Sequence, residues 1–267
     1  MRKHVLSALA FSYLAWTALA AQPATSEPGT IYVVGDSTAK NGNARGWGTP
    51  FAQFFDASLV KIENRAHGGR SSRTFLNEGS WDAVKDNLKP GDLVLIQFGH
   101  NDGGPPDQGR ARGVLRGVGE ESKDFTMPDG KTERVHTFGW YIRKFVQESK
   151  AKGGQPILLS PTVRNIWKDG QVEHELGQYG RWTRQVAEAE HVPFVDLSRI
   201  IAERYQSLGP DAVQALFPED HTHTSEAGAE LNASLVVSGL RALDGAPFDR
   251  FLSTTGRALA AYRAPQP

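Results

Sequence analysis

A hydroxyl, an imidazole and a carboxylate occur in this sequence at positions from which they could act together on a substrate. Ser37 comes just after the apolar run 30–34 and Gly35, so it lies in the turn that leaves a strand. Asp220 and His223 are three residues apart, a spacing that places both side chains on one face of a helical turn. That carboxylate would fix the tautomer of the imidazole, whose other nitrogen could then take a proton from Ser37. These residue types predict nucleophilic catalysis by Ser37.

The same residue types also have ordinary structural roles. Asp and Ser after Gly are common in turns and at helix N-termini, so the tripeptide that ends in Ser37 fits both interpretations by itself. We interpret Asp36 and Asp102 as turn residues that accept hydrogen bonds from backbone amides, and Ser71 and Ser72 as helix-capping residues.

Two further polar loops follow strand-like runs. The first is 64–72, which contains Gly68 and Gly69, and the second is 99–103. The Gly-rich loop matches neither a Walker nor a dinucleotide-binding pattern, so phosphate binding is only weakly indicated. Because the carboxyl ends of parallel strands meet at one edge of a sheet, we expect both loops to converge with Ser37 on one crevice.

The elements that would position these loops alternate along the chain. Short β-branched runs predict strands over 30–34, 60–64, 93–98, 156–160 and 193–197. Helical spacing of apolar residues predicts helices over 48–57, from about 71, over 136–152, over 174–191, from 198, and over 226–243. The alternation predicts a parallel sheet with helices on both faces. The intervening stretch 103–135 is too long for an ordinary connection, so we expect it to form one side of the crevice, with a hairpin around Pro128-Asp129-Gly130.

The first 21 residues have the pattern of a secretory signal peptide. Arg2 and Lys3 precede an apolar run that ends in Ala18-Leu19-Ala20-Ala21, a small-residue cleavage pattern. We therefore expect a secreted or periplasmic protein with a single domain over 22–267, its core over about 30–243, and no membrane span after cleavage. The full sequence has 30 basic and 30 acidic residues, and cleavage removes only Arg2 and Lys3 among them, so the charge balance offers no electrostatic attraction for nucleic acid. The absence of Cys excludes disulfides and thiolate metal sites. We expect a monomer.

Several blocks of this chain, taken in order, resemble the SGNH, or GDSL-type, hydrolases. The four blocks are Gly35-Asp36-Ser37, Gly69, Gly99-His100-Asn101-Asp102 and Asp220-His221-Thr222-His223. Their neighbours are similar to the rhamnogalacturonan acetylesterase branch: Gly35-Asp-Ser-Thr38, Gly69-Arg-Ser71, Phe98-Gly-His-Asn-Asp102, His136-Thr-Phe-Gly-Trp140 and Asp220-His-Thr-His-Thr224. Thr38 replaces the Leu of the name-giving Gly-Asp-Ser-Leu, as it does in that branch. The similarity spans roughly residues 30 to 240.

The resemblance implies roles for these residues. Ser37 would be the nucleophile, His223 the general base and Asp220 its orienting acid, while the amides of Ser37 and Gly69 and the side chain of Asn101 would bind the oxyanion. It also implies a flavodoxin-like α/β/α sandwich with a five-stranded parallel sheet in the order 2-1-3-4-5. No cofactor or metal is implied.

The substrate and its contacts are expectations of the same kind. His100 and His221 lie inside the matching blocks and could touch the substrate or merely hold their loops, and Trp167 could stack on a sugar. We expect removal of acetyl groups from a plant cell-wall polysaccharide, rhamnogalacturonan or another pectin, through an acetyl-serine. Alternatives are an esterase for acetylxylan or another acetylated sugar, or a lipase or thioesterase.

Two more distant alternatives change the class of protein. One is a metal-dependent hydrolase whose ligands come from His100, Asp102, Asp220, His221 and His223, since imidazole and carboxylate bind zinc and manganese well. It leaves Ser37 without a role. The other is a non-catalytic sugar-binding module, which would have no use for the complete set of catalytic residue types.

Overall fold

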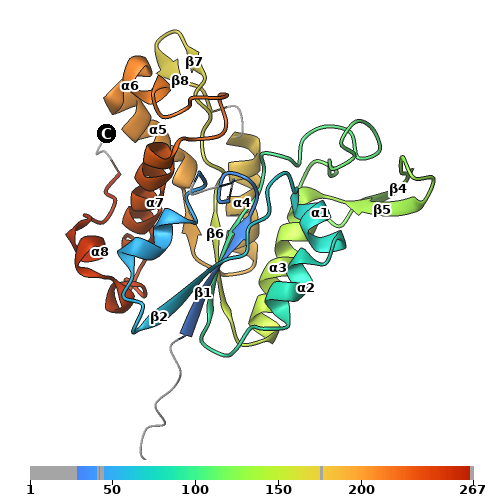
Figure 1. Ribbon diagram of the computed structural model, residues 1–267. Coiled ribbons are helices and arrows are strands. Elements are labelled where there is room, and N and C mark those ends of the chain that lie inside the picture. The colour runs from blue at the N-terminus through green and yellow to red at the C-terminus, as the bar shows by residue number, and fades with distance from the viewer. Residues whose placement is uncertain (1–28, 41, 43–44, 175–176, 265–267) are drawn as a thin grey trace, which may run out of the picture.

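A parallel sheet forms the centre of the molecule (Figure 1). The computed structural model describes residues 29–40, 42, 45–174 and 177–264. The strands of this sheet are β1 (Gly29–Gly35), β2 (Val60–Asn64), β3 (Leu93–Gln97), β6 (Gln155–Leu159) and β9 (Phe194–Val195). They pair in the order β2-β1-β3-β6-β9, every pair parallel. The five predicted strands are confirmed to within a few residues at their ends, and so is the implied order 2-1-3-4-5.

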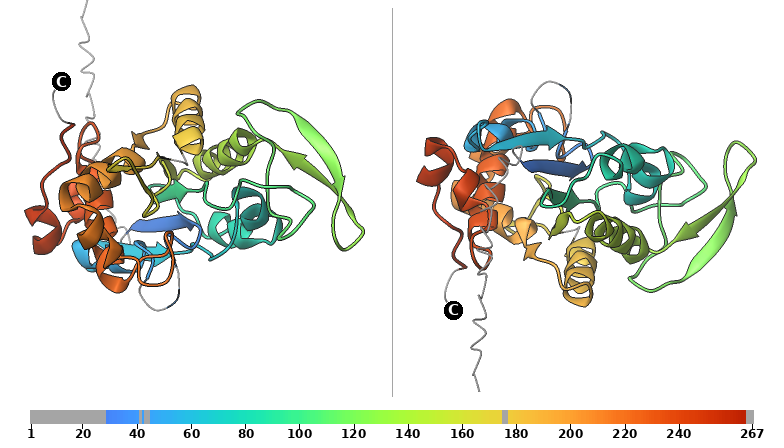
Figure 2. Two further views of the ribbon diagram at one scale, coloured as in Figure 1. Left: turned by 90° about the horizontal axis from the view of Figure 1, so that it is seen from above. Right: turned by 90° about the horizontal axis from the view of Figure 1, so that it is seen from below.

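Alternation along the strands gives the sheet two buried faces. Ile31 and Val33 of β1 belong to one hydrophobic cluster, whereas Tyr32 and Val34 belong to another. Successive side chains of a strand point to opposite faces, so each cluster is the core of one layer. Figures 1 and 2 show helices on both sides of the sheet, which confirms the three-layer sandwich.

Each face of the sheet has its own set of helices. On one face lie α1 (Ser72–Asn77), α2 (Ser80–Lys85), α3 (Phe138–Ala151) and α4 (Gly177–Ala189). On the other lie the 3-10 helix η1 (Pro50–Phe54), α5 (Leu197–Leu208) and α7 (Glu226–Arg241). Shorter elements complete the chain: α6 (Pro210–Gln214), η2 (Asp249–Phe251) and α8 (Thr254–Ala258).

Two helix predictions need correction at their ends. In place of the helix expected over 48–57 the structure has the short 3-10 helix η1, but Phe51, Phe54 and Phe55 are buried, as their helical spacing suggested. The helix expected from His136 begins at Phe138, because His136 ends a strand and Thr137 is the N-cap that accepts a hydrogen bond from the Trp140 amide. Capping, rather than periodicity, therefore sets the start of α3.

The insertion between β3 and α3 carries the predicted hairpin. Its strands β4 (Ser122–Thr126) and β5 (Thr132–His136) pair antiparallel around a turn in which Gly130 has φ 81°. Figures 1 and 2 show this hairpin projecting away from the central sheet. The part that borders the carboxyl edge of the sheet lies earlier in the insertion, where the Val114 amide donates to the Asp102 carbonyl at 3.0 Å. The hairpin itself is therefore not the side of the crevice.

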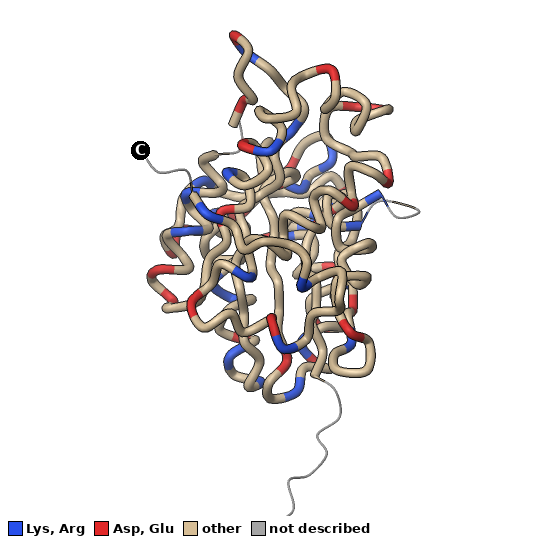
Figure 3. Tube along the Cα trace, turned by 90° about the vertical axis from the view of Figure 1, so that its left-hand side faces the viewer, with Lys and Arg blue, Asp and Glu red and all other residues tan. Residues whose placement is uncertain are grey.

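The predicted signal peptide, residues 1–21, lies outside the described residues. Among the residues that are described, no helix has both the length and the apolar character that a membrane span requires. In the view of Figure 3, basic and acidic positions are interspersed along the chain, in keeping with equal numbers of Lys plus Arg and Asp plus Glu in the sequence. A further short hairpin, β7 (Trp167–Lys168) with β8 (Gln171–Val172), follows β6.

Candidate active site

The structure brings Ser37, His223 and Asp220 into one hydrogen-bonded row. Ser37 Oγ lies 2.9 Å from His223 Nε2, and His223 Nδ1 lies 2.7 Å from Asp220 Oδ2. An ionised carboxylate can only accept, so Nδ1 must carry the ring proton and Nε2 is left as an acceptor for the serine hydroxyl. These three residues, 186 positions apart at their extremes, have the geometry of a nucleophile, its base and the group that orients the base.

The carboxylate of Asp220 stays ionised down to strongly acidic pH. Partial burial would by itself raise its pKa, but hydrogen bonds from the His223 ring and from two backbone amides hold that pKa at about 2. Asp220 Oδ1 accepts the amides of Thr222 at 2.6 Å and His223 at 2.7 Å. These bonds form a turn in the loop before α7, so the expected helical turn is wrong. The loop brings the two side chains together through the carboxylate instead.

A compact turn presents Ser37 at the end of β1. A Cβ on Gly35 would lie 2.8 Å from the Gln97 carbonyl oxygen, so only Gly allows β1 to run this close to the end of β3. Asp36 Oδ1 accepts from the Thr38 amide at 2.9 Å and from the Thr38 hydroxyl at 2.8 Å. The prediction that Asp36 bonds a backbone amide is confirmed. The second bond requires a hydroxyl at position 38, which Thr provides and the Leu of the name-giving motif would not.

The 67–70 loop lies against the Ser37 turn. The His67 amide donates to the Gly35 carbonyl at 3.0 Å, and a Cβ on Gly68 would lie 3.8 Å from Ser37 Cβ. Gly69 adopts φ 77°, a left-handed conformation that favours glycine. Asn101 Nδ2 donates to the Arg70 carbonyl at 2.9 Å and retains a second N–H. The expected convergence of the three loops is confirmed.

Asp102 joins the third loop to the start of α1. Its Oδ1 accepts from the Ser72 amide at 2.9 Å and from the Ser72 hydroxyl at 2.5 Å. Complete burial raises the pKa of this carboxyl to about 7. The hydrogen bonds from Ser72 lower that pKa and the nearby charge of Asp36 raises it, but both effects are smaller than that of burial. Ser71 is the N-cap of α1 and accepts from the Thr74 amide, as predicted, but Ser72 is the first helical residue and its cap role is wrong.

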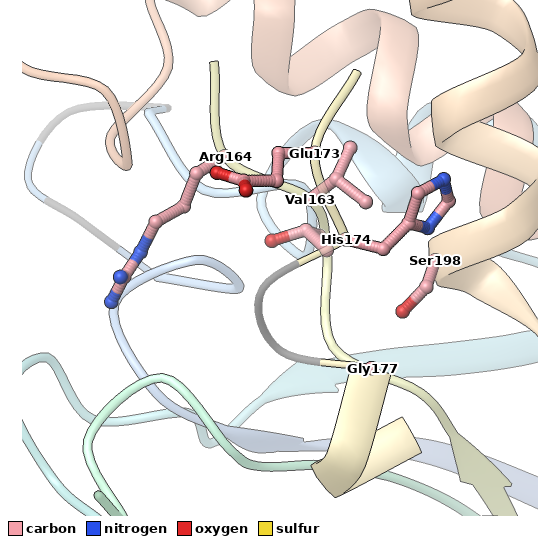
Figure 4. Close-up of a pocket in the computed structure, with 7 residues that line it drawn as sticks. Val163, Arg164, Glu173, His174, Gly177 and Ser198 are labelled. Carbon is pink, nitrogen blue, oxygen red and sulfur yellow. The ribbon is translucent and has the colours of Figure 1, made fainter. Parts of the chain in front are cut away.

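His100 is buried beside the same edge. Its Nε2 lies 2.9 Å from Thr162 Oγ1, which follows β6. Thr162 also lines a small pocket, whose other described residues are Val163, Arg164, Glu173, His174, Gly177 and Ser198. In Figure 4 the His174 ring lies next to Ser198, while the Arg164 side chain extends away from both. The pocket contains none of the residues in the Ser37 row.

His221 and Trp167 are connected through Asn165. The His221 carbonyl accepts from the Asn165 amide at 2.8 Å, and the Trp167 indole N–H donates to Asn165 Oδ1 at 2.8 Å. The His221 side chain is exposed, and Trp167 is half-buried against the core cluster that contains β1. The expected sugar contacts of His100, His221 and Trp167 stay predictions.

The residues of the metal-dependent alternative have other partners. His100 faces Thr162, Asp102 accepts from Ser72, and His223 lies between Ser37 and Asp220. Over the described ranges, no three His, Asp or Glu side chains come together in a way that could hold a metal ion.

Sequence reasoning gave no role to four residues whose contacts hold the loops at the site. Arg112 Nη1 donates to the Gly69 carbonyl at 2.9 Å, and the buried Arg73 donates to the Pro106 carbonyl at 3.0 Å. The Thr224 hydroxyl donates to the Arg45 carbonyl at 3.0 Å, which ties the His223 loop to the loop after Ser37. Only Thr224 stood in a recognisable block. Arginines such as Arg45, Arg73 and Arg112 are usually surface residues, so nothing in the sequence singled them out.

Comparisons with known proteins agree with this geometry. A model of the GDSL-like lipase/acylhydrolase family matches residues 33–231. The rhamnogalacturonan acetylesterase of Emericella nidulans is 35% identical over 211 residues, which are 79% of this chain and 84% of that protein. The rhamnogalacturonan acetylesterase RhgT of Bacillus subtilis is 30% identical over 252 residues, 86% of this chain and 97% of that protein.

Solved structures share the fold. Protein YxiM from Bacillus subtilis superposes with a TM-score of 0.64 at 27% identity, covering 80% of this chain and 56% of that one. The acetylxylan esterase Axe2 from Geobacillus stearothermophilus gives a TM-score of 0.55 at 19% identity, covering 80% and 96%, a likeness of fold alone. The family match includes Ser37, the 67–70 loop and the Asp220–His223 loop, so the chain belongs to the GDSL-like lipase/acylhydrolase family of ester hydrolases.

Proposed function

We propose that this protein is a secreted carbohydrate esterase that removes acetyl groups from rhamnogalacturonan, a pectic polysaccharide. The observation that carries the proposal is the row from Ser37 Oγ through His223 to Asp220, at 2.9 Å and 2.7 Å. The named relatives supply the class of substrate, since two of them are rhamnogalacturonan acetylesterases at 30% identity or more. Secretion follows from the signal-peptide pattern of residues 1–21.

Acylation begins with attack by Ser37 Oγ on the acetyl carbonyl carbon. The hydroxyl proton passes to His223 Nε2, and the imidazolium that results is stabilised by the Asp220 carboxylate. The negative charge that develops on the carbonyl oxygen is bound by the Ser37 and Gly69 amides and the free N–H of Asn101. Within the described part of the chain neither backbone amide has an acceptor, so both are available. The sugar leaves with the proton from His223, and Ser37 carries the acetyl group.

Deacylation repeats these steps with water. His223 Nε2 takes a proton from a water molecule, which attacks the acetyl-Ser37 carbonyl in the same oxyanion site. Collapse of the intermediate returns the proton to Ser37 Oγ and releases acetate. Each proton lost by a nucleophile is returned to a leaving group, so no cofactor is needed.

A groove next to the catalytic row suits an acidic polymer. Its described lining includes Lys40 and His67, together with Gly68, and none of the described residues that line it is a carboxylate. Arg65 also lines it, with its guanidinium paired to Glu63 at 2.7 Å. Gly68 is also the residue that lies against Ser37. A uronic acid carboxylate next to the acetylated sugar could therefore interact with the basic groove while the acetyl group reaches Ser37.

Acetate release from a panel of polymers tests the substrate. We expect kcat/KM to be highest on acetylated rhamnogalacturonan and lower on acetylxylan, which lacks the uronate backbone. Added salt should raise KM for the pectic substrate more than for acetylxylan, because salt screens attraction between exposed charges. Faster turnover of acetylxylan, with equal salt dependence for both polymers, would contradict a pectic substrate and leave the ester chemistry intact.

The length of the acyl chain separates this function from lipase or thioesterase activity. A long acyl chain gains about 0.8 kcal/mol per methylene only where an apolar surface excludes water. The loops around Ser37 are polar, notably 67–70 and the stretch that carries Arg112. On aryl esters from acetate to octanoate we therefore expect kcat/KM to fall as the chain lengthens. A rise along this series would favour a lipase or thioesterase.

A further inference from the structure

The two peptide planes that meet at Gly69 are each held by an arginine. The Gly68 carbonyl, in the plane before Gly69, accepts from Arg70 Nη1 at 3.1 Å. The Gly69 carbonyl, in the plane after it, accepts from Arg112 Nη1 at 2.9 Å. Arg70 belongs to the loop itself, whereas Arg112 comes from the insertion 43 positions away. Two independent parts of the chain thus direct guanidinium groups at neighbouring carbonyls.

Both guanidinium groups are held in place by the protein. Arg70 Nε donates to Glu78 Oε2 at 2.7 Å, just past the end of α1. The Arg112 side chain is half-buried, so the residues around it limit where its guanidinium can lie. The chain just before Arg112 is held by the buried Arg73, which also donates to the Ala111 carbonyl.

These contacts determine where the Gly69 amide points. In a trans peptide the N–H points opposite to the C=O, and the described chain contains no cis peptide. Fixing the Gly68 carbonyl therefore fixes the direction of the Gly69 N–H. Fixing the direction of the Gly69 carbonyl restricts rotation about ψ, the bond that follows the Gly69 Cα. Gly69 has φ 77°, and glycine is the residue that can most easily rotate out of such a conformation.

We propose that Arg70 and Arg112 are positioning residues that keep the Gly69 N–H aimed at the oxyanion. This inference rests on the proposed function, in which that amide is one of three oxyanion donors. Neither arginine needs to touch the substrate. A donor that is already oriented costs no reorganisation when charge develops. Arg70 on the Gly68 carbonyl also polarises the peptide that carries the Gly69 N–H toward a stronger donor, whereas Arg112 acts through orientation alone. Loss of either arginine should therefore weaken transition-state binding more than ground-state binding.

The test compares Arg70→Gln and Arg112→Gln with a matched control, Arg134→Gln. Arg134 lies on the same insertion, in β5, and pairs with Asp124 of β4 at 2.8 Å. With an aryl acetate as substrate, we expect each of the first two variants to lose about 10–100-fold in kcat with KM within about twofold of wild type. Arg134→Gln should keep both constants. Arg70→Lys and Arg112→Lys, which retain a charged donor, should recover part of the lost kcat.

Several results would overturn the inference. Unchanged kcat in both Gln variants would show that the carbonyl contacts do not matter to turnover. A rise in KM with unchanged kcat would make the arginines ground-state substrate contacts instead. A loss of kcat that the Lys variants do not relieve at all would also contradict the inference. All assays are run well below each variant's melting temperature, so that unfolding is not mistaken for loss of positioning. Ser37→Ala is measured alongside: activity that survives it refutes the proposed function, whereas the arginine results refute only the inference.

Discussion

Ser37→Ala is expected to fold normally and to lose roughly 10⁴-fold or more of its esterase activity. The substitution removes the only hydroxyl that the structure places within hydrogen-bond reach of His223 Nε2 among the described residues, at 2.9 Å. Water could still be activated by His223 in the oxyanion site, so the residual rate would reflect that slower route. The Ser37 side chain is small and its loss leaves the turn held by Asp36 and Thr38.

The control for this variant is a serine with a purely structural hydroxyl. Ser253 is the N-cap of α8, accepts from the Gly256 amide at 3.2 Å and lies outside the catalytic loops. Ser253→Ala should keep full activity and lose about 0.5–2 kcal/mol of stability, as a lost cap does. Acetate release and thermal melting of both variants give the comparison. An Ser37→Ala protein with near wild-type turnover would end the serine mechanism.

Asp220→Asn is expected to reduce kcat by roughly 10³–10⁴-fold, through the tautomer of His223. Asp220 Oδ1 accepts two backbone amides, from Thr222 and His223, and an NH₂ group cannot replace it there. The Asn oxygen must therefore face the backbone, which leaves the NH₂ facing His223 Nδ1. That NH₂ donates, so Nδ1 becomes the acceptor and the ring proton moves to Nε2. His223 can then no longer accept the proton of Ser37.

The pH dependence of wild type and variant checks this assignment. The pKa of Asp220 is lowered from its ordinary value to about 2, so the carboxylate is charged across the range in which an esterase is assayed. Its contribution to stability is complete above the ordinary pKa and is lost only as the pH falls through about 2. Loss of wild-type activity on acidification to pH 4 should therefore come from groups other than Asp220. A variant with more than a tenth of wild-type kcat would contradict the orienting role.

Local sequence was sufficient to predict the strands of the sheet and to identify the residues of the catalytic row. Strands β1 and β3 are short apolar runs bounded by turns, and burial on both faces makes such runs continuous rather than alternating. The edge strand β2 (Val-Lys-Ile-Glu-Asn) alternates instead, because it is only partly buried. Ser37, Asn101 and the Asp220–His223 pair lie in compact blocks, and their residue types limit what chemistry they can do. Strand order came only with the resemblance, because spacing does not say which strands are neighbours.

Tertiary structure alone decided how these groups are oriented. Asp220 and His223 meet in a loop closed by the carboxylate rather than on a helix, and Ser72 donates to Asp102 across 30 positions rather than capping α1. Arg70 lies in the block Gly69-Arg-Ser71, but the block does not say which carbonyl its guanidinium reaches, and Arg112 lies in no block at all. The spacing of apolar residues along one element shows which side of that element is buried, and this can be read from a short stretch of sequence. Hydrogen-bond partners far apart in the chain, such as Arg112 and Gly69, are chosen only when the elements pack.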